Sequence, residues 1–145
     1  MTPTPPPTAQ AAAFARLPLL DGQRRIVGYE LVDNGPPDDA DPAARDAGLL
    51  LQALALCSQA GADEARLLFV RCQPETLAGE HMALLDPARV GIEVALPPVA
   101  EPARIDALVP VLAAALGRGF RLALRHEALA SAWRPWLLHA SYLFI

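Results

Sequence analysis

Two glutamates stand inside apolar runs of this sequence, at positions where α/β proteins often keep working carboxylates. Glu30 lies in RRIVGYELVDNGPP, residues 24–37, where a run predicted as a strand gives way to a turn-rich loop. Glu93 lies in the same way inside VGIEVAL, residues 90–96. A carboxylate near a strand end can serve as a ligand of a hard metal ion or as a general base. The first question is therefore whether these two glutamates belong to a site.

Two arginines at the ends of neighbouring apolar runs offer these glutamates a different use. Arg71 follows RLLFV, residues 66–70, and Arg125 follows FRLAL, residues 120–124. If the four side chains converge at one end of a sheet, the guanidinium groups can neutralise buried carboxylates without any ligand. The same arginines could instead hold a small anion or a phosphate, because a guanidinium fork fits such groups. A weak metal site formed by the two glutamates is the third interpretation.

The histidines and cysteines offer weaker candidates. His126 next to Glu127 has the composition of an acid–base pair, but a histidine in a loop at a strand end more often faces solvent. The other histidines have no metal-ligand neighbours in the sequence, and the two cysteines lack the spacing of a metal site. We therefore expect Cys57 and Cys72 to be buried, reduced thiols.

The order of apolar and amphipathic segments predicts the elements that position these residues. Strands at 14–20 and 26–32, joined by the turn DGQR, predict an opening β-hairpin. Near-continuous apolar strands then alternate with helices, which indicates an α/β protein with a mostly parallel sheet. Because a closed (β/α)8 barrel takes ~250 residues, a chain of 145 residues allows a partial or open TIM-like barrel. Helices are predicted at 43–60, 73–85, 102–116 and 127–138, and later strands at 66–70, 90–96, 120–124 and 141–145.

Length and composition limit the class of protein. A chain of 145 residues with 53% apolar residues fits one soluble domain. The net charge of −4 gives no electrostatic footprint for nucleic acid or for an anionic membrane surface. All 12 basic residues are arginines, which excludes lysine chemistry. Residues 1–13 predict a disordered Pro-rich leader and no signal peptide, and no run reaches the ~18 apolar residues of a membrane span, so a cytoplasmic protein is expected.

The opening FARLPLLDGQRRIVGYELV, residues 14–32, resembles the start of the EAL domain, the cyclic-di-GMP phosphodiesterase fold of bacterial signalling. It is most similar to the EAL modules that precede an HDOD domain, whose start combines an aromatic-Ala-Arg motif with Gly-Tyr-Glu-Leu. Residues 14–145 are then identified as the N-terminal part of such a domain, a truncated EAL-like domain. The resemblance implies a modified TIM barrel whose strand ends hold divalent ions that activate a water for attack on a phosphodiester.

Position by position, the resemblance keeps two acidic ligands and loses the rest of the implied site. Glu30 falls on the glutamate of the EAL signature, and Glu93 falls on the first glutamate of a Glu-x-x-Glu pattern. Arginines where a cation should bind oppose metal binding by charge repulsion. We therefore predict no catalytic residue and no cofactor, with Mg or Mn needed only if residual activity exists. The family's glutamine, phosphate-contacting arginine, asparagine, second glutamate, paired aspartates and lysine are replaced, in that order, by Leu17, Asn34, Arg71, Leu96, Arg125 with His126, and Phe144.

The resemblance thus implies a catalytically inactive EAL-like signalling module that acts through contact with a protein partner in cyclic-di-GMP-type regulation. The alternative is a sensor that binds cyclic-di-GMP without hydrolysing it, and an active phosphodiesterase ranks third. Trp133 and Trp136 are expected to pack, and would mark a contact surface if they were exposed. The apolar strand at 142–145 leaves open a homodimer through that strand.

Overall fold

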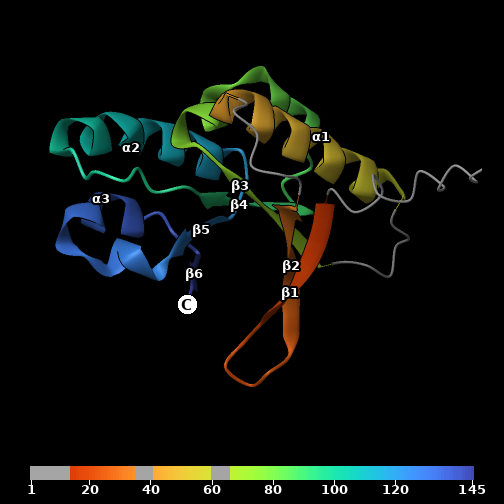
Figure 1. Cartoon of the computed structure of the whole chain (residues 1–145). Coiled ribbons are helices and arrows are strands. Elements are labelled where there is room, and N and C mark those ends of the chain that lie inside the picture. The colour runs from red at the N-terminus through yellow and green to blue at the C-terminus, as the bar shows by residue number, and fades with distance from the viewer. Residues whose placement is uncertain (1–13, 35–40, 60–65) are drawn as a thin grey trace, which may run out of the picture.

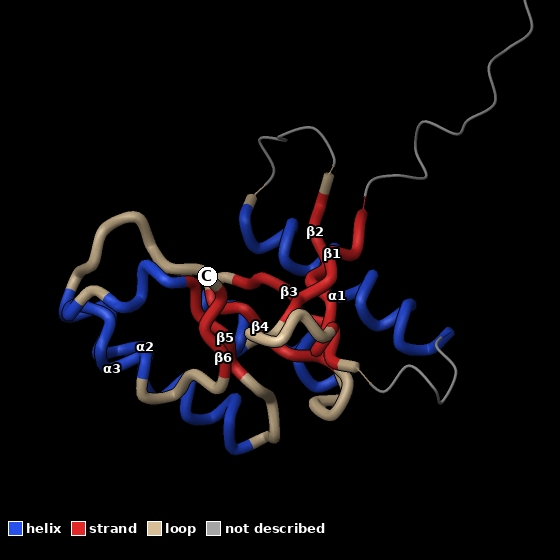
Figure 2. The backbone as a smooth tube through the Cα atoms, turned by 90° about the horizontal axis from the view of Figure 1, so that it is seen from below, coloured by secondary structure: helices blue, strands red, loops and turns tan. Residues whose placement is uncertain are grey.

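Six strands build one curled sheet. The computed structural model describes residues 14–34, 41–59 and 66–145, and its strands follow the sheet in chain order, β1-β2-β3-β4-β5-β6. The first two strands are antiparallel, and every later pair of neighbours is parallel. Figure 1 and Figure 2 show the sheet curling into a half-barrel with helices packed along it. The predicted α/β class, opening hairpin and partial TIM-like barrel are confirmed.

The opening hairpin pairs β1 (Phe14–Leu20) with β2 (Ile26–Asp33) and projects beyond the rest of the sheet (Figure 1). Asp21 organises its turn. The carboxylate accepts hydrogen bonds from the backbone N–H groups of Gln23 at 2.8 Å and of Arg25 at 2.9 Å. It also pairs with the Arg25 guanidinium at 2.9 Å. An aspartate that satisfies the backbone in this way explains why DGQR turns the chain.

After the hairpin, helices and parallel strands alternate as the apolar pattern predicts. Long helices begin at prolines, which suits the first helical turn because its N–H groups have no partner within the helix. The elements are α1 (Pro42–Gln59), β3 (Leu67–Cys72), η2 (Pro74–Ala78), η3 (Glu80–Leu84), β4 (Val90–Val94), α2 (Pro102–Gly117), β5 (Leu122–Arg125), η4 (His126–Leu129), η5 (Ser131–Trp133), α3 (Arg134–Leu137) and β6 (Tyr142–Phe144).

The segments 73–85 and 127–138, predicted as helices, consist of short pieces instead. The 3-10 helices η2 and η3 replace the first, and η4, η5 and the four-residue α3 replace the second. Gly79 and Ala130 stand at the interruptions with extended backbone. An extended residue breaks the hydrogen-bond ladder that a continuous α-helix requires. The strand predicted at 120–124 is displaced toward the C-terminus, since β5 runs from Leu122 to Arg125.

Some predictions concern residues outside the described ranges. These are the disordered leader at 1–13 and the last residue of the first predicted helix, residue 60. Among the helices that the structure describes, none combines the length and the apolar character needed to cross a bilayer.

One face of the sheet packs against the helices and forms the main core. Leu31, Val70, Ile92 and Leu124, from four neighbouring strands, are all buried in it. Successive residues of a strand point to opposite faces, so the residues between these four face the concave side of the sheet. Because both faces of the sheet are largely covered in this way, strands such as β3 and β4 are apolar along almost their whole length.

The two tryptophans belong to this core. Trp133 and Trp136 are buried, with ring centroids 5.1 Å apart. The indole Nε1 of Trp136 donates a hydrogen bond to the Ile105 carbonyl oxygen at 2.9 Å, which satisfies the polar end of a ring that is otherwise enclosed. The prediction that both rings pack is confirmed, and the condition under which they would mark a contact surface, exposure, is not met.

Phe69 fills the concave side of the sheet. Its ring makes edge-to-face contacts with Tyr142 and Phe144 of β6, with centroid distances of 5.2 Å in both cases. Glycine is required opposite it, because a Cβ atom at Gly91 would lie 2.5 Å from a ring carbon of Phe69. A close approach also explains Gly28, where a Cβ atom would lie 2.7 Å from the backbone oxygen of residue 67. On the side of the strands' amino ends, the concave face is therefore a packed apolar layer.

Candidate functional site

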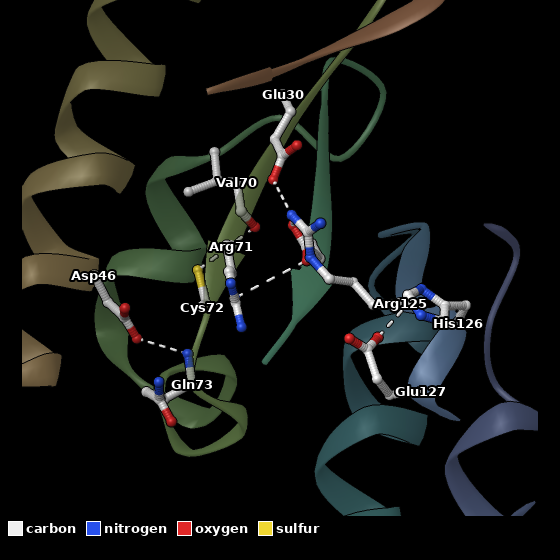
Figure 3. Close-up of polar contacts among 10 residues, drawn as sticks. Glu30, Asp46, Val70, Arg71, Cys72, Gln73, Arg125, His126 and Glu127 are labelled. Carbon is white, nitrogen blue, oxygen red and sulfur yellow. Dashed lines mark hydrogen bonds and ion pairs between the residues drawn. The ribbon is translucent and has the colours of Figure 1, made fainter. Parts of the chain in front are cut away.

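A charged layer lies above this apolar layer, at the carboxyl ends of the parallel strands. Glu30 on β2, Arg71 on β3, Glu93 on β4 and Arg125 on β5 form it. In the sheet register Arg71 is the neighbour of Glu93, two positions beyond Phe69 on the same strand face. Figure 3 shows Glu30, Arg71 and Arg125 converging from three different strands. The sequence prediction that these side chains meet is confirmed.

Arg125 bridges both glutamates. Its Nη2 donates to Glu30 Oε1 at 2.8 Å, and its Nε donates to Glu93 Oε1 at 2.5 Å. A longer contact of 3.4 Å joins Nη2 to the second oxygen of Glu93. Arg71 is more distant, with 4.0 Å between its Nε and Glu93 Oε1. The predicted carboxylate–arginine cluster therefore exists, with Arg125 as its centre.

Glu30 and Glu93 are both buried, and Glu93 is the more deeply enclosed, with 0% of its surface exposed. Burial raises the pKa of its carboxyl to about 7, and the nearby carboxylate of Glu30 acts in the same direction. The hydrogen bond and charge of Arg125 oppose this effect without cancelling it. The pKa of Arg125 is raised, because the attraction of Glu93 and Glu30 exceeds the effect of its own partial burial. The surroundings of Glu93 therefore favour its protonated form more than water does.

The cluster does not fit a divalent cation. Mg²⁺ and Mn²⁺ need several oxygen ligands around one point. Here the guanidinium of Arg125 stands between Glu30 and Glu93 and holds an oxygen of each. A cation using both carboxylates would have to occupy the volume of that guanidinium. Within the described ranges, no group of three or more histidine, cysteine, aspartate or glutamate side chains is placed to hold a metal ion.

The remaining positions of the implied site are scattered around this cluster. Leu17 on β1 is the register partner of Glu30 but is 48% exposed. Asn34 is exposed and lies directly beyond the end of β2. Phe144 belongs to the apolar layer through its contact with Phe69. Leu96 follows β4 and is half-buried. Only part of the predicted set is therefore brought together.

His126 faces away from the cluster and is exposed. Its Nδ1 lies 3.5 Å from the Glu127 carboxylate, and both side chains are 59% exposed (Figure 3). An exposed pair of this kind contributes little energy. The expectation that this histidine faces solvent is confirmed.

Both cysteines are free, as predicted. Burial raises the pKa of the Cys72 thiol far above its usual range. Cys57 is only half-buried, so its predicted burial holds in part, and desolvation raises its pKa as well. Raised pKa values keep thiols protonated and weakly nucleophilic.

Sequence reasoning missed a pocket of about 320 Å³ that opens beside the charged layer. The pair of prolines at 97 and 98, which two residues separate from the end of β4, was the available signal, because proline has no N–H to donate to a strand ladder and the chain leaves the sheet there. The pocket is lined by Arg71, Glu93, Val94, Leu96, Pro97, Pro98, Ala100, Arg125, Glu127 and Trp133.

Asp46, also missed, supports the loop that follows Arg71. It is buried on α1 and accepts hydrogen bonds from Gln73 N at 2.7 Å and from Thr76 Oγ1 at 2.6 Å. These bonds satisfy backbone and side-chain donors at the start of η2, and they fix α1 to the carboxyl end of β3. An aspartate on the inner side of an apolar helix was its sequence signal.

Comparison with known proteins found no match, either among models of protein families or among curated protein sequences.

Proposed function

We propose that this chain is a catalytically inactive EAL-like signalling module, close to the modules that precede HDOD domains. In this proposal it works in the bacterial cytoplasm and acts through contact with a protein partner in cyclic-di-GMP-type regulation. The opening motif at 14–32 and the pattern of kept and replaced site positions support the assignment. The half-barrel with a leading antiparallel hairpin is consistent with it.

The position of Arg125 carries the inactive part of the proposal. Its guanidinium takes the place between Glu30 and Glu93 that a catalytic metal would need. A like charge at ~4 Å costs about 4 kcal/mol at an effective dielectric constant near 20, so a cation and this guanidinium exclude each other. Arg71 adds a second positive charge at the same mouth. The two carboxylates are therefore neutralised from within the chain.

The contact role is supported by apolar side chains on the projecting hairpin. Leu20 is 57% exposed at the end of β1, and Val27 and Ile26 are exposed near the start of β2. Leu17 adds a fourth aliphatic side chain on the same element. Exposed aliphatic side chains gathered on one projecting element are consistent with a contact role.

A cyclic-di-GMP assay with Mg²⁺ or Mn²⁺ tests the inactive assignment. We expect the purified chain to form no linear product under conditions in which an active EAL phosphodiesterase converts the substrate completely. The reason is that neither glutamate is available to a metal. Turnover that disappears in Glu30→Ala would overturn the proposal, because it would mean that two carboxylates suffice.

The sensor remains the second candidate because Arg71 presents an exposed guanidinium that could meet a phosphate. Two features oppose it: the replaced positions Leu17 and Asn34, and a pocket volume of about 320 Å³, which is small for two guanines and two phosphates. Equilibrium binding of labelled cyclic-di-GMP, measured alongside the turnover assay, separates the candidates. Saturable binding lost in Arg71→Gln would favour the sensor.

A further inference from the structure

The pocket beside the charged layer has a mixed lining. Its ionisable residues are Arg71, Glu93, Arg125 and Glu127. Its apolar residues are Val94, Leu96, Pro97, Pro98, Ala100 and Trp133. Small-molecule sites in proteins combine an apolar lining with a few fixed polar groups in this way, and a volume of about 320 Å³ lies at the lower end of their range.

Arg71 is the charged group of this pocket whose hydrogen-bond donors the described residues leave largely unsatisfied. Its side chain is 52% exposed, and its ion pair with Glu93 is 4.0 Å long. Across the described residues, no hydrogen bond within 3.5 Å engages its guanidinium, whereas Arg125 donates to two carboxylates. The five N–H donors of Arg71 are therefore available to a group entering the pocket.

We propose that this pocket binds a small organic monocarboxylate with an apolar, preferably aromatic, body, and that Arg71 holds the carboxylate. A planar guanidinium binds a carboxylate through two parallel hydrogen bonds. One available guanidinium balances one negative charge. The carboxylate of Glu127 in the lining, with that of Glu30 behind Arg125, disfavours a dianion such as a phosphate monoester.

The volume fits this ligand class. A cavity of about 150 Å³ lined by apolar residues is enough for benzene. The 320 Å³ here accommodates an aromatic ring, a short linker and the carboxylate. The ring would lie against Leu96, Pro97 and Trp133, and the carboxylate would lie toward Arg71. This inference does not rest on the proposed signalling role, and it holds or fails independently of it.

Calorimetric titration of the full chain with phenylacetate at pH 6.5 tests the proposal. We expect saturable binding that weakens by about tenfold or more in Arg71→Gln, since hydrogen bonds to a charged group are lost. Arg104→Gln is the matched control, because Arg104 is also a partly exposed arginine in an ion pair but contacts Glu75 away from the pocket. We expect this control to bind like the wild type.

Two analogues and a spectrum sharpen the result. Phenylacetamide, which has the same shape without the charge, should bind at least about tenfold more weakly, and phenyl phosphate should not bind more tightly than phenylacetate. In a ¹⁵N spectrum the indole resonance of Trp133 should shift more than that of Trp136, which does not line the pocket. Any of four results would overturn the proposal. Arg71→Gln, with an unchanged melting temperature, could bind phenylacetate as tightly as the wild type, or the wild type could bind phenylacetamide as tightly as phenylacetate. The wild type could also bind phenyl phosphate more tightly than phenylacetate, or show no binding at about 10 mM phenylacetate, a concentration that would detect even weak affinity.

Discussion

Arg125 forms ion pairs with both Glu30 and Glu93. Its positive charge offsets the two negative charges that a bound metal ion would otherwise have to balance. Removing Glu93 from water is costly, and Arg125 offsets this cost only partly, so the pKa of Glu93 is raised to about 7. The sequence could predict this meeting, because Glu30 and Glu93 lie inside predicted strands and Arg125 directly follows one, all in one sheet. It could not predict which arginine would be central. Which arginine bonds to both glutamates depends on the side-chain conformations in the folded protein. Arg71 instead lines the pocket, which residues distant in the sequence help to form.

The raised pKa of Glu93 predicts a pH-dependent stability. The folded carboxyl binds its proton more tightly than the unfolded one, whose pKa is near 4.5. Its contribution to stability is therefore complete below pH 4.5 and is lost as the pH rises through 7. The loss amounts to about 3 kcal/mol at most.

Melting temperatures from pH 5 to pH 8 measure this effect. Glu93→Gln cannot titrate, so its stability relative to the wild type should improve as the pH rises, whatever its starting value. Glu127→Gln changes an exposed glutamate that also lines the pocket and should follow the wild-type profile. Parallel profiles for Glu93→Gln and the wild type would show that Glu93 stays ionised throughout.

At the scale of elements, the packing of the strands depends on how tightly Phe69 fills the concave face of the sheet. Strand existence was predictable, because long apolar runs between turn residues leave few alternatives. The helices in 73–85 and 127–138 were not, because Gly79 and Ala130 take extended backbone that composition alone does not reveal. The close contact of Phe69 with Gly91 was also beyond prediction, since it depends on the register that makes these two residues neighbours on β3 and β4.

Gly91→Ala should destabilise the protein by roughly 1–3 kcal/mol, because the new methyl group overlaps the buried Phe69 ring. Gly48→Ala is the matched control. Gly48 lies in α1, where an added Cβ meets nothing within 4 Å, and replacing a helical glycine stabilises by about 0.5–1 kcal/mol. Urea denaturation of both variants gives the two signs. A neutral Gly91→Ala would mean that Phe69 moves aside at little cost.

At the scale of the whole molecule, the two edges of the sheet differ. β1 carries Pro18 and Arg16, and both proline and charge discourage pairing with another chain. In the described part of the chain β6 pairs only with β5, and its three residues are apolar or aromatic. The sequence predicted this asymmetry, because the residues at both edges can be read directly. The curvature that leaves the half-barrel open required the structure.

Among residues 14–34, 41–59 and 66–145, no second strand pairs with β6, and this predicts self-association of the 145-residue chain. Unpaired N–H and C=O groups beside apolar side chains favour a strand from a second copy. Light scattering at tens of micromolar should therefore give a mass above the 15.4 kDa of one chain. Ile145→Lys places a charge next to β6 and should shift the mass toward one chain, whereas Leu138→Lys, at another exposed aliphatic residue, should not. A wild-type chain that stays at the mass of one copy would show that the β6 edge is protected in solution.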